Sequence, residues 1–501
     1  MTMSVMTLPR LAVTLDGASL APVLAQRLTK LELRQVLGAP AVLDLSFSDA
    51  PADVLATLRP GQSVTVAQDS GPALFAGFVT EIAQTSRADR AATFRLTARD
   101  RLHKLACRQS LLALQDVSAA DVGAHLAGDV GLTFACREPV AKRQVVVQHE
   151  QSDLDFLSDL AAEAGLYPVE RAGQLLLLPL SGDGESALTL TQGQGLLSVH
   201  TCLRADRSLP GGSLAGRDAV TLSPRASQLS LARQDQIEMR NPGGDLGVGR
   251  LHLLHRTTET GAEADGVLQA SLDRAAADMA LAEGLAEGNP ALVPGRVVQL
   301  NGLSDRFGGL YVLTRTLHRM TADEGYVTEF STEPSRRPAP PRTPVTTIAE
   351  VTDVADPENL GRARVALAEF SGLASGWMHV VLPGAGARKG LAALPDVGDL
   401  VLVLMPEGDL GRGMILGGLY GSERLPKNAE DSPRGIVLRS SDGQVLELAG
   451  ADGTARLANR SGSFLDIHPG GMRLAAASDL LIEAPGKTIT IRAAAIKLER
   501  G

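Results

Sequence analysis

Apolar and polar residues alternate with a period of two over much of the chain, and this pattern predicts mainly β structure. Residues 1–105 contain short runs of this kind, such as 11–15 and 43–47, and predict a first antiparallel β domain. Residues 185–335 repeat the pattern around one helix expected at 267–285. They predict a second, barrel-like β domain.

Residues 106–184 change to a helical pattern. Ser118 and Asp121 have the spacing of a capping box, which predicts the start of one helix. Ser152 caps a second helix in the same way, and Gly165 supplies its left-handed stop. This segment is predicted to be a small α/β insert.

Two linkers and a compact barrel follow. Residues 336–349 are rich in proline, which cannot donate the hydrogen bonds of a strand, and predict a semi-rigid linker. Residues 350–421 combine about five short strand candidates with many glycines, as in a small closed barrel. Residues 422–434 predict a second linker before the C-terminal tail.

The tail, residues 435–501, repeats pairs of apolar residues at alternate positions, separated by turns such as Asp442-Gly443 and Pro485-Gly486. Each repeat predicts one strand with two inward side chains, which is too few for the core of one chain. Three chains wound into a β-helix needle would complete the core. About eight such strands would give a rod roughly 40 Å long. The predicted axis comprises Leu465, Ile467, Leu480, Ile482, Ile489, Ile491, Ile496 and Leu498.

Composition narrows the class of protein. The net charge of −9 argues against a nucleic-acid partner, because phosphate binding needs a basic face. The N-terminus has neither a basic segment nor an apolar segment of a secretory signal, so synthesis in the cytoplasm without a signal peptide is expected. The three widely spaced cysteines are expected to be reduced.

Candidate chemistry is sparse. The glycine-rich segment 384–390 lacks the strand and helix of a phosphate-binding motif and is interpreted as a barrel loop. His252 and His255 lie in a strand pattern and are interpreted as structural, as is the acidic pair Asp153 and Asp155 in a first helical turn. No catalytic, metal-binding or cofactor-binding residue is nominated, and a protein that is not an enzyme is expected.

The predicted barrel carries an ordered motif that comprises Asp356, Pro357, Gly361, Arg362, Trp377, Pro395, Gly398, Asp399 and Gly417. This motif resembles the OB-fold domain shared by VgrG proteins and phage baseplate spikes. Upstream, Ser152-Asp153, Phe156-Leu157 and Gly165 resemble a helix of the VgrG hub, and 292–295 with His318 resemble its second barrel. Trp377 is interpreted as a barrel core residue.

The resemblance implies tandem hub β-barrels in residues 1–105 and 185–335, an OB-fold barrel in 350–421 and a trimeric needle in 435–501. It implies a homotrimer in the baseplate of a contractile injection particle. Expected partners are the inner tube protein, baseplate proteins, a PAAR-like tip protein at the needle end and the target cell envelope. The short segment between barrel and needle leaves no room for a lysozyme domain, and no effector extension is expected after the needle.

Two alternatives stay open. One is a type VI secretion VgrG spike, which the short needle disfavours. The other is a β-helical tailspike hydrolase that acts on surface polysaccharide, which would need a pair of carboxylates in the groove of a long solenoid.

Overall fold

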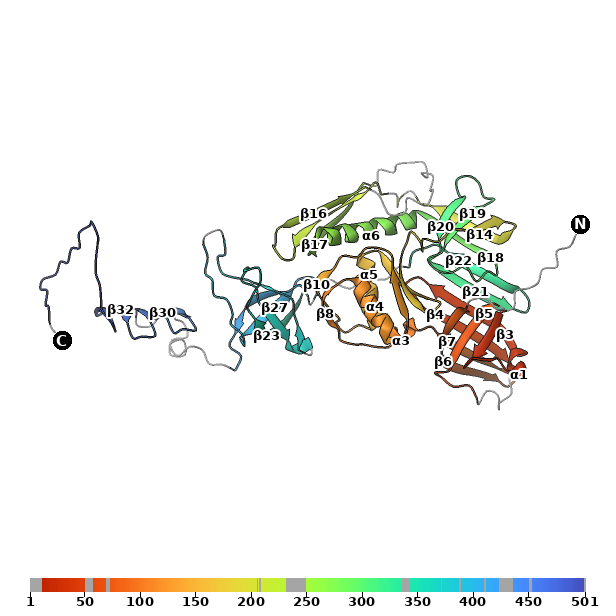
Figure 1. Ribbon diagram of the computed structural model, residues 1–501, viewed down its shortest axis with the longest axis horizontal. Coiled ribbons are helices and arrows are strands. Elements are labelled where there is room, and N and C mark those ends of the chain that lie inside the picture. Colours follow the sequence, from red (N-terminus) through yellow and green to blue (C-terminus); the bar gives the residue numbers. More distant parts are fainter. Residues whose placement is uncertain are drawn as a thin grey trace, which may run out of the picture. The chain divides into compact units, whose positions relative to one another are not determined.

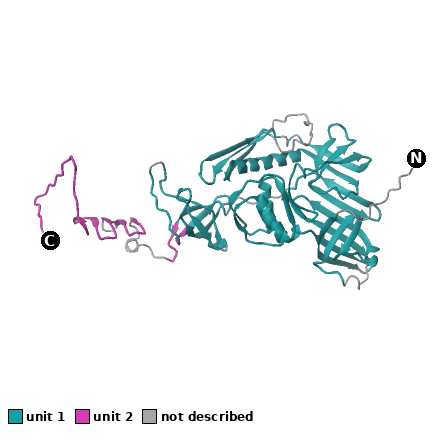
Figure 2. Cartoon of the chain, in the orientation of Figure 1, with its two compact units in different colours: residues 1–397, 402–417 teal, residues 398–401, 418–501 magenta. Residues whose placement is uncertain are grey.

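The computed structural model is mainly β, with a series of β-sheets and three longer helices in the described residues (Figure 1). The chain folds into two compact units, unit 1 with residues 1–397 and 402–417 and unit 2 with residues 398–401 and 418–501 (Figure 2). The described residues are 11–49, 57–68, 73–204, 206, 209–230, 249–335, 343–370, 372–386, 389–409, 411–422, 436–449 and 453–499.

A 14-stranded sheet dominates unit 1. Its first half consists of β1 (Leu11–Leu15), β2 (Ala18–Ser19), β3 (Leu28–Val36), β4 (Ala39–Ser48), β5 (Ser63–Gln68), β6 (Ala73–Arg87) and β7 (Arg90–Arg99). Its second half consists of β13 (Leu188–Gln192), β14 (Gly195–Leu203), β18 (Ala280–Glu287), β19 (Val297–Asn301), β20 (Gly309–Val312), β21 (Arg315–Thr321) and β22 (Gly325–Ser331). Helix α1 (Pro22–Ala25) lies between β2 and β3.

The two halves join through one antiparallel pair. Strand β21 pairs with β3 from Arg315 opposite Val36 to Thr321 opposite Lys30. Alternating side chains of the first half, Leu31, Leu33, Leu43, Leu45 and Phe47 among them, fill one core. Leu196, Ala282, Leu300 and Phe330 contribute to a second core. The two predicted β domains are therefore joined by a continuous ladder of hydrogen bonds.

The insert contains β8 (Ala113–Val117), β9 (Thr133–Cys136), β10 (Arg143–Val147), β11 (Leu166–Arg171), β12 (Gln174–Pro179), α3 (Leu102–Ala106), α4 (Ala119–Asp129) and α5 (Asp153–Glu163). Both predicted helix starts are confirmed, since Ser118 forms a capping box with Asp121 and Ser152 accepts from the Asp155 amide. Gly165 follows α5 with a φ of +72°. The helices bury Val122, Leu126 and Leu157 against β11 and β12.

A three-stranded sheet of β15 (Gly212–Asp218), β16 (Pro224–Leu229) and β17 (Leu251–Thr258) packs on α6 (Gly261–Met279), as Figure 1 shows. The predicted bounds 267–285 of this helix were wrong. The helix is capped by Thr260 and begins at Gly261, six residues before the predicted start. From Ala280 the chain pairs with β14 and β22, so sheet hydrogen bonds replace the last predicted turns. His252 lies in β17 as predicted and contacts Ser213 Oγ at 2.8 Å.

Six strands form a further sheet, called here the small barrel: β23 (Val345–Asp353), β24 (Arg364–Leu367), β25 (Leu373–Ala374), β26 (His379–Val380), β27 (Leu400–Met405) and β28 (Met414–Leu419). A short 3-10 helix, η2 (Ala368–Phe370), follows β24. The first strand of the small barrel, β23, begins at Val345, inside the predicted linker 336–349. Val351, Val365 and Val403 lie in the interior of the small barrel. Residues 336–342 of that linker and 423–434 of the second predicted linker lie outside the described residues, as does residue 435 of the predicted needle.

The tail forms an antiparallel meander, called here the ribbon: β29 (Ile436–Arg439), β30 (Val445–Ala449), β31 (Thr454–Ala458), β32 (Phe464–His468) and β33 (Gly471–Ala475). Each strand pairs with the next strand in the chain. The alternation of the sequence therefore gathers the Ile, Leu and Met side chains of the ribbon on one face, while its charged residues lie on the other face. Residues 476–499 contain no strand in this chain.

Candidate functional site

The apolar face of the ribbon consists of two columns of side chains that are in register from strand to strand. One column comprises Ile436, Leu448, Ala455, Ile467 and Met472. The other comprises Leu438, Leu446, Leu457, Leu465 and Leu474. Of the predicted axis residues, Leu465 and Ile467 thus lie on this face.

This apolar face is uncovered in the single chain. Among its large side chains, Leu457 is 54% exposed and Met472 is 68% exposed. On the opposite face, Arg456, Phe464 and Asp466 are only partly exposed. A contiguous exposed apolar strip of this kind marks an interaction site in a protein that stays in solution.

The other six predicted axis residues continue the same pattern beyond the ribbon. Leu480, Ile482, Ile489, Ile491, Ile496 and Leu498 are 48% to 95% exposed. Their segment was predicted to form three further strands, and in the isolated chain it forms none. A strand with neither a hydrogen-bonded neighbour nor a covered face has little to offset the entropy of ordering it.

Within the small barrel, an ion pair closes the loop between β23 and β24. Arg362 donates to both carboxylate oxygens of Asp356, at 3.1 and 2.7 Å, and the amide N–H groups of Glu358 and Leu360 also donate to Asp356. The two side chains are 3% and 2% exposed. The Arg362 hydrogen bonds hold the pKa of Asp356 well below its usual range. Gly361, at a φ of +70°, lets the loop turn back toward its own aspartate.

The remaining motif residues lie elsewhere on the small barrel. Pro357 is exposed in the same loop. Pro395, Gly398 and Asp399 lie in the segment that leads into β27, and Gly398 has a φ of +94°. Gly417 lies in β28. The structure thus brings together only the part of the motif that forms the aspartate–arginine loop.

Trp377 does not occupy the barrel core, and this prediction was wrong. It is only partly buried, with the guanidinium of Arg364 stacked 4.7 Å from its ring. The neighbouring Met378 is fully buried instead. Consecutive residues of an extended segment point to opposite sides, so the core position and the surface position are exchanged by one step in register.

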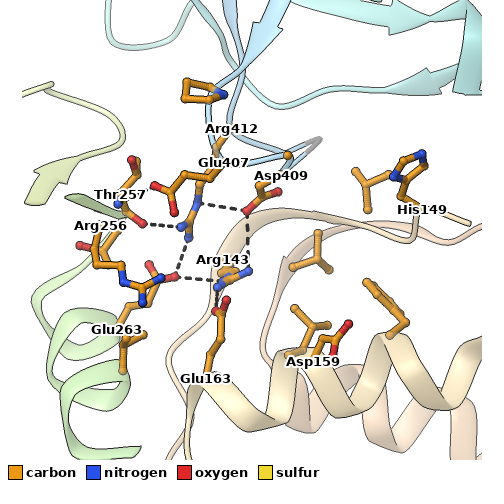
Figure 3. A pocket seen from close by; sticks show the side chains of 18 of the residues that line it. Arg143, His149, Asp159, Glu163, Arg256, Thr257, Glu263, Glu407, Asp409 and Arg412 are labelled. Carbon is orange, nitrogen blue, oxygen red and sulfur yellow. Dashed lines mark hydrogen bonds and ion pairs between the residues drawn. The ribbon is translucent and has the colours of Figure 1, made fainter. Parts of the chain in front are cut away.

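A second candidate site, called here the charged joint, lies where the loop before β28 meets α6 and β10 (Figure 3). Arg412 Nη2 donates to Glu263 Oε1 at 2.5 Å, and Nη1 donates to the Thr257 carbonyl at 2.6 Å. The Thr257 amide N–H in turn donates to Glu407 at 2.9 Å. These bonds connect the small barrel to the start of α6.

Arg143 of β10 brings the insert into the same network. Its Nε donates to Glu263 Oε1 at 3.0 Å, so one carboxylate oxygen receives both arginines. Its Nη2 contacts the carboxylate of Glu163 in α5, and its Nη1 lies 3.8 Å from the carboxylate of Asp409 in the small barrel. Figure 3 shows Arg412 and Arg143 close together beside Glu263, with dashed lines from them to Glu263, Glu163 and Asp409.

Burial and charge act against each other in this joint. Burial alone would raise the pKa of Glu263, but Arg412 and Arg143 outweigh it and lower the pKa. Burial dominates at Glu259, 3.5 Å from Arg412, and raises the pKa of that carboxyl. Glu263 is therefore the carboxylate that stays ionised and bridges the two arginines.

Beside the joint is a cleft of about 680 Å³ between α5, α6 and the small barrel. Apolar side chains, Val146, Phe156, Leu160 and Val267, line it together with the charged groups. Among the residues that the structure describes, no group of three or more His, Cys, Asp or Glu is arranged to hold a metal ion. None of the helices in those residues has the length and apolar character needed to cross a membrane.

Two family models match the sequence. The model described as phage tail baseplate hub (GPD) matches residues 29–324, more than half of the chain. The chain belongs to this baseplate hub family. A second model, described as the type VI secretion system/phage-baseplate injector OB domain, matches residues 347–420, which is the small barrel.

This baseplate hub protein also resembles individual proteins. The type VI secretion system spike protein VgrG5 of Pseudomonas aeruginosa is 26% identical over 467 residues, covering 79% of this chain and 56% of that protein. The chain thus spans about half the length of that curated relative.

Among solved structures, an E. coli component of the type VI secretion system, itself similar to T4 bacteriophage tail proteins gp27 and gp5, is 17% identical with a TM-score of 0.50. The match covers 81% of this chain and 99% of that chain. The lidded Francisella PdpA-VgrG complex is 9% identical with a TM-score of 0.53, covering 93% and 79%. These likenesses support the mainly β fold with a separate OB domain.

The charged joint of this hub protein was not predicted from its sequence. Its members come from four separate segments, and each looks like an ordinary surface charge in its own segment. Asp153 was likewise interpreted only as a helix-start acid. It is fully buried and accepts from Ser110 and Gln148, so it ties α5 to the segments before it.

Proposed function

We propose that three copies of this chain form the hub and the piercing spike of a phage-tail-like contractile injection machine. The family match supports a baseplate hub. The observation that carries the spike is the ribbon, whose two apolar columns are exposed over five consecutive strands. A face of this kind is stable in water when it is covered, and other copies of the same ribbon present matching columns.

Three ribbons wound around one axis would turn their apolar columns inward and their charged faces outward. Paired strands without free edges make a stiff rod that resists unfolding under load. The segment 476–499 would then find strand partners and a covered face only in the assembled needle. In this proposal the needle pierces the target envelope when a sheath contracts.

The remaining partners follow from the same role. The hub would bind the inner tube protein and other baseplate proteins, and a separate PAAR-like tip protein would cap the needle end. The particle's baseplate would be the site of action. The role is mechanical, without a catalytic residue and without nucleic acid as a ligand.

The mass of the purified protein tests the proposal. We expect three times the chain mass of 52.3 kDa in native mass spectrometry. Ile489→Asp or Ile491→Asp would place three charges at the apolar axis and should abolish the trimer. Thr490→Asp, between them and on the opposite side of an extended strand, is the matched control and should stay trimeric. A wild-type monomer with an ordered tail would refute the proposal.

A type VI secretion spike is the second candidate, and the similarity to VgrG5 over 467 residues favours it. The two candidates predict different surroundings for the same trimer. Affinity purification of the native protein should recover sheathed, free particles in the first case and a cell-anchored secretion apparatus in the second.

A further inference from the structure

The polar face of the ribbon carries a column of alternating charge. Glu447 of β30 lies directly opposite Arg456 of β31, which lies opposite Asp466 of β32, which lies opposite Arg473 of β33. The sign of the charge reverses at every step. This column, called here the charge ladder, runs on the face opposite the two apolar columns.

Ion-pair and cation–π contacts connect neighbouring residues along this face. Arg456 Nη1 lies 3.6 Å from Asp466 Oδ2. The guanidinium groups of Arg456 and Arg473 lie 4.8 and 5.2 Å from the ring of Phe464, one on each neighbouring strand. These contacts leave the Asp466 side chain only 21% exposed, less than that of Arg456 at 42%.

The apolar columns alone do not specify the pairing of these strands. Side chains alternate with a period of two, so a slip by two residues keeps every side chain on its own face. The connection between β31 and β32 runs from Ala458 to Phe464 and is long enough to accommodate a different register. Such a slip would move Arg456 from Asp466 to a position opposite Phe464 or His468.

We infer that the charge ladder sets the strand register of the ribbon, and thereby brings the apolar columns of three chains into step. Opposite charges directly across a strand pair stabilise the pairing, and like charges at the same positions destabilise it. Only the native register gives an attraction at all three steps of this ladder. The inference deepens the proposed function, because it rests on the ribbon's assembly into a needle.

Charge variants of Arg456 test the ladder through the temperature at which the trimer dissociates. Arg456→Glu turns two attractions into repulsions and should lower this temperature. Arg456→Lys keeps the charge but not the planar stacking on Phe464, and should stay near the wild type. Arg460→Glu makes the same charge change in the turn outside the ladder and is the matched control. In 1 M salt the deficit of Arg456→Glu should shrink, because surface charges are screened.

Two combined variants distinguish a ladder from an isolated ion pair. Arg456→Asp with Asp466→Arg keeps the central pair attractive but sets like charges at both of its ends, so a ladder predicts no rescue. Reversing all four charges, at Glu447, Arg456, Asp466 and Arg473, restores alternation and should recover most of the lost stability. Full rescue by the central swap alone would overturn the ladder.

The register itself can be read by a cross-link. Ala458 of β31 and Phe464 of β32 are directly opposite on the polar face, so cysteines at these positions should form a disulfide when the three natural cysteines are replaced by serine. The yield should fall in the Arg456→Glu background and return when all four ladder charges are reversed. An unchanged yield would overturn the inference. If the wild type were not trimeric, the proposed function would fail instead, and the cross-link would still report the register.

Discussion

Replacing Arg412 by methionine should loosen the charged joint between the small barrel and α6. The side chains of Arg412 and Glu263 are 11% and 7% exposed, so both charges are stabilised by neighbouring protein groups rather than by water. Methionine has a similar length but donates no hydrogen bond. The Thr257 carbonyl would lose this donor, and Glu263 Oε1 would lose one of its two arginine donors.

The structure sets the size of this effect. Removing one partner of a buried ion pair costs about 3–5 kcal/mol when the other charge is left unpaired. Arg143 stays 3.0 Å from the same Glu263 oxygen, so part of the compensation remains. We therefore expect a loss of about 2–3 kcal/mol in the free energy of unfolding.

A surface pair provides the matched control. Arg315 lies 3.5 Å from Glu283, with side chains 56% and 51% exposed. Arg315→Met should cost less than about 1 kcal/mol, because an exposed ion pair adds little. The measurements are urea unfolding of both variants and hydrogen exchange at the Thr257 amide, whose partner Glu407 lies across the joint. If Arg412→Met unfolds at the same urea concentration as Arg315→Met, and exchange at Thr257 is unchanged, the joint does not stabilise the chain.

Three further predictions concern buried ionisable groups. Burial raises the pKa of Asp100 to about 8, so the free energy of unfolding should fall as the pH rises from about 4 to 8. Asp100→Asn should flatten this pH dependence in urea titrations. An equal dependence on pH in both proteins would contradict the prediction. Burial lowers the pKa of His318 to about 4. The neutral His318 therefore contributes to stability above about pH 6.5, and this contribution is lost as the pH falls through 4. His318→Gln, which can still hydrogen-bond Tyr326, should remove this acid sensitivity in thermal unfolding between pH 4 and 7. Asp356→Asn should destabilise the small barrel by about 2 kcal/mol, because a charge-assisted double hydrogen bond is lost; an unchanged unfolding midpoint would argue against that role.

Short sequence motifs predicted the elements that are stabilised by hydrogen bonds between residues close in sequence. The capping residues Ser118 and Ser152 mark the helix starts, because the bonds they accept come from within three residues. Where a distant strand competes, the local signal fails. The apolar spacing after Met279 resembles a helix, but hydrogen bonds to β14 and β22 make residues 280–287 a strand.

The mainly β class, the helical insert, the small barrel and the two-faced tail follow from the order of residues alone, because periods of two and of 3.6 can be read directly from that order. The three-dimensional packing is needed to show that β3 and β21 join two sheets into one, that Arg143, Glu263 and Arg412 meet, and that the charges of the ribbon alternate from strand to strand. These features depend on which distant segments become neighbours. That choice is made by the packing of the whole chain, so no single segment carries its signature.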